Sequence, residues 1–227
     1  MDILHREDLK LGGFAGLKEH RLVMDDKVFK GRSNLGTWQG IGDFVYLADA
    51  QFNPLGDTTL HDHKEVDVIS VMVDGRVSHE GSLKNGQSLQ AGQVQVQRAG
   101  AEGFSHNEIN PDTTKNRMIQ LWVLPEKSGE CADYKFYPLS ENGLLRIYGG
   151  DAGQGDTFSS QTLIDVGYLK AGEQLKIEQN FIMYMIKGTA IASGQMIGDG
   201  DLLRGESVNI EVRADAMIIV ITERSGT

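Results

Sequence analysis

Short runs of apolar residues, bounded by Gly, Asn and Asp, recur along the chain. The clearest runs are residues 43–47, 66–73, 118–124, 181–186 and 216–221. Each has the length of a β-strand and is rich in β-branched and aromatic residues. No segment sustains the 3.6-residue spacing of an amphipathic helix. The pattern therefore predicts an all-β protein built as a barrel or a sandwich.

A weak internal repeat divides the chain into two similar halves. The segment Val73-Asp74-Gly75-Arg76-Val77 is echoed by Ile186-Lys187-Gly188-Thr189-Ala190, and the turn at Gly92 is echoed at Gly200. A repeat this long indicates a duplicated domain rather than a solenoid. We expect an N-terminal barrel over residues 1–130 and a C-terminal barrel over residues 131–227. Asp74-Gly75 and Asn85-Gly86 are typical hairpin turns.

Composition and charge narrow the classes of partner and location. The formal net charge of −10 disfavours direct binding to nucleic acids or to anionic membranes, which requires a basic surface. No stretch approaches the roughly 18 apolar residues of a membrane span, and the charged first residues do not look like a signal peptide. Cys131 is the single cysteine, so no internal disulfide can form. We expect a cytoplasmic protein without membrane contact.

Two pairs of residues carry the candidate chemistry. His61 and His63 are two residues apart, as are His106 and Glu108. In a strand, side chains at i and i+2 point to the same face, so both pairs can point into one barrel. Three imidazoles and one carboxylate suit a first-row divalent metal ion with open positions for water or substrate. Asp67 is a candidate partner behind the ligands, where its carboxylate would accept the free ring N–H of a ligating histidine.

The other histidines and the second half of the chain offer no further candidate metal ligands. His79 stands beside Glu80 and Gly81, so we expect it in a solvated turn. His5 and His20 have no partner in the sequence pattern. The repeat places other residue types where the four candidate ligands stand, so we expect no metal ligands in the C-terminal barrel; these residues are Gln174, Lys176, Ala214 and Ala216.

Several short segments around the two pairs follow one another in an order that can be compared with known families. They are Leu60-His61-Asp62-His63-Lys64-Glu65-Val66-Asp67, Val77-Ser78-His79, Ala91-Gly92-Gln93, Ala99-Gly100, Phe104-Ser105-His106-Asn107-Glu108-Ile109-Asn110-Pro111, Gln120-Leu121-Trp122-Val123 and Pro125-Glu126. This series resembles the pirin family of bicupins over about residues 40–130. The resemblance implies two tandem cupin β-barrels (double-stranded β-helices). It also implies one metal ion held by His61, His63, His106 and Glu108.

The resemblance also sets the functional expectations. In that family the metal is usually iron, and Zn, Mn, Ni, Co or Cu are alternatives here. Some pirins open flavonols such as quercetin with O2, which implies a metal-dependent dioxygenase of the quercetin 2,3-dioxygenase type, with Glu108 as proton acceptor. The alternative is a non-catalytic, metal-containing binding or regulatory protein with a protein partner. A metal-free binder of small molecules is a third possibility.

The chain departs from the pirin pattern at three places. Asp62 replaces the usual Pro between the first two histidines, and Asp67 stands where a Glu is usual. The aromatic-rich stretch with its Phe-Ser-Phe pattern is absent from residues 10–35. Because that stretch commonly borders the pocket, we expect the substrate to differ more than the metal site.

Overall fold

The structure is a computed structural model that describes residues 1–31, 36–83 and 87–224. Strands make up 60% of the chain and helices 3%, which confirms the all-β prediction. The chain divides into two compact units. We call Leu9–Pro138 the first barrel, and Met1–Asp8 with Leu139–Thr227 the second barrel.

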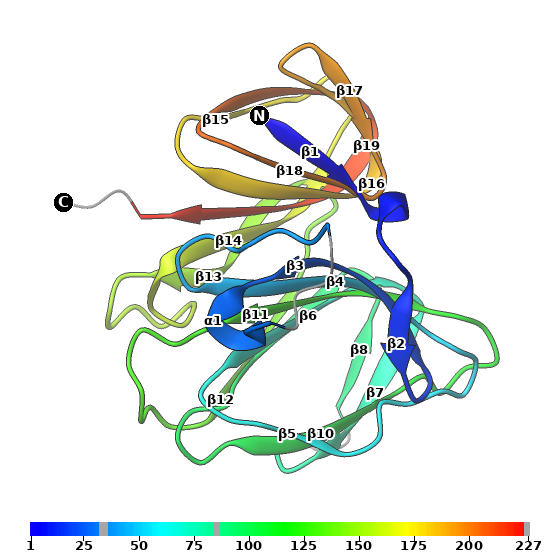
Figure 1. The fold of residues 1–227 in the computed structure, drawn as a ribbon, viewed down its shortest axis with the longest axis vertical. Helices are drawn as coiled ribbons and strands as arrows, with labels where there is room; N and C mark the ends of the chain where they lie inside the picture. Colours follow the sequence, from blue (N-terminus) through cyan, green and yellow to red (C-terminus); the bar gives the residue numbers. More distant parts are fainter. Residues whose placement is uncertain (32–35, 84–86, 225–227) are drawn as a thin grey trace. The chain divides into compact units, whose positions relative to one another are not determined.

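The first barrel consists of two antiparallel sheets that face each other as two layers (Figure 1). The larger sheet has the strand order β12-β9-β6-β11-β4-β3-β2, and the smaller has the order β5-β10-β7-β8. The elements are β2 (Gly12–Phe14), β3 (Leu17–Met24), α1 (Asp26–Phe29), β4 (Phe44–Phe52), β5 (His61–His63), β6 (Asp67–Asp74), β7 (Arg76–Gly81), β8 (Ser88–Gln90), β9 (Gln93–Arg98), β10 (Phe104–Ile109), β11 (Arg117–Val123) and β12 (Asp133–Pro138).

The two sheets differ in how their strands are buried. The predicted continuous apolar runs form β4, β6 and β11, which are buried on almost every residue. The strands β7 and β10 instead alternate between buried and more exposed residues. An alternating strand has one face toward the interior and one toward solvent. The smaller sheet can therefore point polar side chains into the barrel from only one of its faces.

The second barrel is a single curved sheet with the order β1-β18-β16-β19-β14-β13, to which β15 and β17 add. Its core is aliphatic and includes Met183, Met185, Ile210 and Ile218. The elements are β1 (Asp2–His5), the 3-10 turn η1 (Arg6–Asp8), β13 (Gly143–Gly150), β14 (Ser160–Leu169), β15 (Gln174–Ile177), β16 (Phe181–Ala192), β17 (Gln195–Gly198), β18 (Asp201–Gly205) and β19 (Val208–Glu223).

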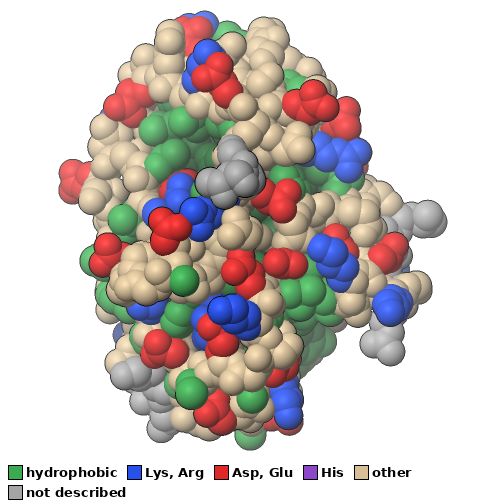
Figure 2. All heavy atoms as spheres, turned by 90° about the vertical axis from the view of Figure 1, so that its left-hand side faces the viewer, with side chains coloured by type: hydrophobic (Ala, Val, Ile, Leu, Met, Phe, Trp, Pro, Cys, Tyr) green, Lys and Arg blue, Asp and Glu red, His purple; other side chains and the backbone are tan. Residues whose placement is uncertain are grey.

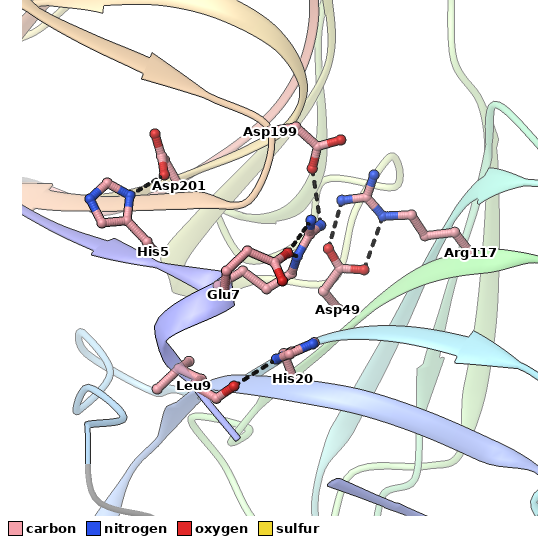
Figure 3. Close-up of polar contacts among 9 residues, drawn as sticks. His5, Glu7, Leu9, His20, Asp49, Arg117, Asp199 and Asp201 are labelled. Atoms are coloured by element: carbon pink, nitrogen blue, oxygen red, sulfur yellow. Dashed lines mark hydrogen bonds and ion pairs between the residues drawn. The ribbon is translucent and has the colours of Figure 1, made fainter. Parts of the chain in front are cut away.

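The first eight residues belong to the second barrel, which differs from the expected division at residue 130. The strand β1 pairs with β18 along its whole length, and Ile3 packs against the core of the second barrel. His5 Nδ1 lies 2.6 Å from a carboxylate oxygen of Asp201 (Figure 3). A strand of four residues with only two apolar side chains gives no sign in the sequence of which barrel it joins. The assignment of metal binding to one barrel alone stays a prediction.

Paired glycines support the internal repeat. Gly75 and Gly188 both have positive φ, at +72° and +97°, as do Gly92 and Gly200, at +80° and +89°. Gly75 lies in the turn between β6 and β7, as predicted, whereas Gly188 lies at an irregularity within β16. A Cβ at Gly188 would lie 2.4 Å from the Asp215 carbonyl oxygen, so the position requires glycine. The predicted turn at Asn85-Gly86 lies outside the described residues.

Acidic and basic side chains are interspersed on the face that Figure 2 shows. On the face in Figure 2, Asp and Glu lie beside Lys and Arg, and no continuous basic area interrupts them. That mixture is consistent with the expectation from net charge that nucleic acid is not a direct partner. Among the described residues, no helix is long and apolar enough to cross a membrane.

Candidate metal centre

The smaller sheet of the first barrel brings the candidate residues to one face. In β10, His106 is paired with His61 of β5, and Glu108 is paired with His79 of β7. Directly opposed residues in antiparallel strands point to the same side of the sheet. His63 is paired with Phe104 and follows the same parity. All these side chains therefore point to one side of the sheet.

Three ring nitrogens meet at one point. The Nε2 atom of His106 lies 2.9 Å from Nε2 of His61 and 3.1 Å from Nε2 of His63. Among the described residues, these three histidines form a group whose ligand atoms lie within 4.8 Å of one another. Nitrogens that bind one ion at about 2.0–2.1 Å lie roughly 3 Å apart, so the spacing suits a shared first-row divalent ion.

The surroundings favour uncharged imidazoles at this point. Burial lowers the pKa of His63 to about 4, and the neighbouring His61 contributes to the shift. Burial lowers the pKa of His106 further below its usual value, and the adjacent His63, His61 and His79 add to the effect. Only a deprotonated ring nitrogen can bind a metal ion. The site is therefore ready for a cation at neutral pH without first losing protons from these two rings.

His79 is not a solvated turn residue, and that prediction was wrong. Only 3% of His79 is exposed, and its Nε2 lies 2.7 Å from Nδ1 of His106. The physical reason is the pairing of β7 with β10, which turns His79 to the same side as Glu108. Its spacing of two residues from the buried Val77 was the signal in the sequence, because alternate residues share a face.

A chain of hydrogen bonds fixes the orientation of His106. His79 forms a side-chain hydrogen bond with Gln97, and burial is what lowers the pKa of His79 to about 4. If Nδ1–H of His79 donates to the Gln97 amide oxygen, its Nε2 must accept from Nδ1–H of His106. The lone pair on Nε2 of His106 then faces His61 and His63. Such a partner behind a ligating histidine sets its tautomer and its ring orientation.

Glu108 lies near this group but has other partners. The three-histidine group does not include it; its Oε1 accepts a hydrogen bond from Ser70 at 3.2 Å, and it also bonds with Gln120. Glu108 is 1% exposed. Burial raises the pKa of Glu108 to about 7, against the lowering effect of Ser70 and Gln120. The carboxyl group can therefore hold or release a proton near neutral pH. Its role as a fourth ligand stays a prediction.

Asp67 is engaged by an arginine. Both of its carboxylate oxygens accept hydrogen bonds from Arg98, at 2.7–3.1 Å, and Asp67 is completely buried. Arg98 also forms an ion pair with Glu130. The contact to the free nitrogen of a ligand candidate comes instead from His79. The expected role of Asp67 behind a histidine stays a prediction.

A cavity of about 540 Å³ opens onto the site. His61, His63 and Glu108 line one part of it. Trp122 also lines the cavity, and its ring centroid lies 5.4 Å from that of His63, 4.7 Å from that of Tyr46 and 5.8 Å from that of Phe29. Stacked aromatic rings offer a flat apolar surface to a planar ligand.

The remaining predicted positions lie away from this cavity. His20 bonds through Nδ1 to the carbonyl of Leu9 (Figure 3), and Cys131 is an exposed free cysteine. In the second barrel, Gln174 and Lys176 lie on β15. Within the described part of the chain, the group of metal-capable residues is confined to the first barrel.

Fold and site together define the class: a protein of two cupin barrels, one of which carries a three-histidine site beneath a cavity. Comparison with known families agrees. Residues 28–123 match the family described as Pirin, which confirms the predicted resemblance to that family.

Individual relatives carry names that bear on the site. A protein named quercetin 2,3-dioxygenase from Escherichia coli O157:H7 is 25% identical over 170 residues, which cover 70% of this chain and 73% of the relative. The solved structure of bacterial pirin YhhW from Escherichia coli in complex with nickel(II) has a TM-score of 0.83 at 19% identity, with 97% of each chain covered. Quercetin 2,3-dioxygenase from Acinetobacter baumannii has a TM-score of 0.73 at 16% identity, covering 98% of this chain and 85% of that one.

Proposed function

We propose that this protein is a metal-dependent dioxygenase of the pirin type that opens an electron-rich enol or phenol with O2, with flavonols such as quercetin as the first candidates. The observation that carries the proposal is the convergence of three Nε2 atoms beside a cavity with an aromatic wall. The names of the relatives support the substrate class. The nickel in the related pirin structure supports a divalent ion.

In this proposal His61, His63 and His106 hold one divalent ion, with iron as the first expectation. The ion supplies Lewis-acid polarisation of the substrate oxygen. Glu108 completes the ligand set that the resemblance implies and accepts the proton of the substrate hydroxyl, since its carboxylate lines the same cavity. Trp122 and Tyr46 hold the flat ring and exclude water. The second barrel, predicted over residues 131–227, contributes no ligand.

The test is oxidation of quercetin in air by untagged, iron-loaded protein. Loss of flavonol absorbance should accompany uptake of one O2 per flavonol in the wild-type protein. His61→Ala should abolish both signals, whereas His20→Ala should leave them unchanged because His20 lies outside the site. A fully loaded protein that oxidises none of several flavonols and catechols would contradict the proposal. That result would favour the alternative, a metal-containing protein that binds a partner without turnover.

A further inference from the structure

Glu19, Arg21 and Tyr46 form a charged cluster in the lining of the cavity. Nε and Nη2 of Arg21 both lie 2.6 Å from Oε1 of Glu19. Tyr46 donates its hydroxyl to Oε2 of Glu19 at 2.9 Å. Burial raises the pKa of Tyr46 well above its usual value, and the Glu19 charge adds to this, so the hydroxyl stays a donor.

Glu19 and Arg21 are exposed to very different degrees. The Glu19 side chain is 2% exposed, and both of its oxygens have partners in Arg21 and Tyr46. The Arg21 side chain is 31% exposed. A guanidinium has five N–H donors. Glu19 accepts from the edge formed by Nε and Nη2, and the Tyr46 hydroxyl also bonds with Arg21. Glu19 and Tyr46 therefore hold Arg21 in place, and its remaining N–H groups can donate to a ligand in the cavity.

The strand register relates Arg21 to Gln120, a partner of Glu108, across two neighbouring strands. Arg21 is paired with Ala48, and Ala48 with Gln120, so these residues form one row across β3, β4 and β11. With about 4.8 Å between strands, the Cα atoms of Arg21 and Gln120 are about 10 Å apart. Gln120 bonds with Glu108, and both Arg21 and Gln120 line the cavity. A single ligand in the cavity can therefore contact Arg21 at one end and the surroundings of Glu108 at the other.

The charged residues that flank His63 in the cavity lining do not offer an equivalent site. Asp62 accepts a hydrogen bond from the Ser105 hydroxyl, and Glu65 accepts one from the backbone N–H of Gly129. Lys64 is the other cation among the described lining residues, but it is exposed. An exposed ammonium is strongly hydrated, whereas an oriented guanidinium binds a carboxylate through two parallel hydrogen bonds.

We propose that Arg21 forms an anion subsite, so that the preferred substrate is an aromatic acid: a hydroxylated ring that carries its hydroxyl to the metal centre and its carboxylate to Arg21. This proposal rests on the proposed function for the hydroxyl end alone. Arg21 lies in the stretch of residues 10–35 where this chain departs from the pirin pattern. The subsite thus gives that departure a role, because a neutral flavonol has no group for it.

The test compares 3,4-dihydroxybenzoate with catechol, which has the same two hydroxyls and no carboxylate. Binding of each to nickel-loaded and to metal-free protein is measured by calorimetry, after the metal content has been determined. In the wild type the acid should bind at least about tenfold more tightly than catechol, as expected for a charge-assisted pair. Arg21→Gln should reduce that ratio to about one and leave catechol binding unchanged. Lys64→Gln should keep the wild-type ratio.

Arg21→Gln leaves the buried Glu19 carboxylate without its cation, which can destabilise the fold. The double variant Glu19→Gln/Arg21→Gln removes both charges, and it should likewise lose the preference for the acid. A wild-type ratio near one, or an undiminished ratio in either folded variant, would overturn the proposal. Protein that binds no metal would overturn the proposed function instead, and the metal-free titrations would still measure the role of Arg21.

Discussion

Nε2 of His79 lies 2.7 Å from Nδ1 of His106, so a buried histidine supports the central residue of the metal-capable group from behind. His79→Phe removes this acceptor and leaves Nδ1 of His106 without its partner. We expect the affinity for Ni²⁺ to fall by about 10–100-fold, the usual cost of losing such a partner. His79→Gln, which keeps an acceptor oxygen, should lose less. Competition with a chromophoric chelator measures both, and wild-type affinity in His79→Phe would refute the role.

A substitution at Glu108 should lower the rate of turnover without loss of the metal ion from the histidines. Glu108→Gln keeps the size of the side chain and its bonds to Ser70 and Gln120, but it removes the proton acceptor. We expect flavonol oxidation to fall by about 100-fold or more, while the three imidazoles still hold the ion. Steady-state rates and the metal content of the same samples show whether Glu108→Gln loses turnover while it keeps the ion. Full activity in Glu108→Gln would exclude Glu108 as the acceptor.

Asp67 and Arg98 form a buried ion pair whose disruption should cost stability. Asp67→Asn leaves the guanidinium without its main partner in the core, and we expect a loss of about 3 kcal/mol in the free energy of unfolding. Asp112→Asn is the matched control, because Asp112 pairs with Arg76 at the surface and should change little. Urea denaturation compares the two variants. The nickel affinity of Asp67→Asn also tests whether Asp67 supports a ligand.

The contact between His5 and Asp201 makes the second barrel sensitive to pH. The hydrogen bond that His5 donates to Asp201 raises the pKa of His5 above 6.5; burial opposes the shift, and the charges of Asp201 and Asp8 add to it. The stabilisation is therefore complete below pH 6.5 and is lost as the pH rises through the folded-state pKa. The His5 side chain is 55% exposed, so the effect should be less than about 1 kcal/mol.

Denaturation of wild-type and Asp201→Asn protein at pH 5.5 and pH 9 measures this effect. The difference in stability between the two proteins should be larger at pH 5.5 than at pH 9. Equal differences at the two pH values would show that the pair contributes nothing through ionisation.

The sequence predicted those parts of the fold that depend on local patterns. The apolar runs at 66–73 and 118–124 became β6 and β11 almost without change. The runs at 181–186 and 216–221 mark only the most buried parts of β16 and β19. Outside these runs both strands continue with a mixture of buried and more exposed residues. Spacing by two residues likewise put His61 and His63 on one face of β5, and the pairing of β5 with β10 added His106.

The sequence could not predict features that depend on register between strands. His79 joins the site only because β7 pairs with β10, and Arg21 faces Gln120 only through the order β3-β4-β11. Asp67 has the parity of a residue behind the metal centre, but its partner comes from β9, 31 residues further along the chain. Pairing between distant strands is a property of the folded sheet rather than of any short segment.

The central claim is that three imidazoles hold one metal ion in the first barrel, and nickel titration of untagged, metal-stripped protein tests it most directly. Calorimetry with elemental analysis of the dialysed complex should give one ion per chain in the wild type and none in His61→Ala/His106→Ala. His5→Ala/His20→Ala, which removes two histidines outside the site, should still bind one ion. No binding in the wild type, or one ion retained by His61→Ala/His106→Ala, would contradict the account.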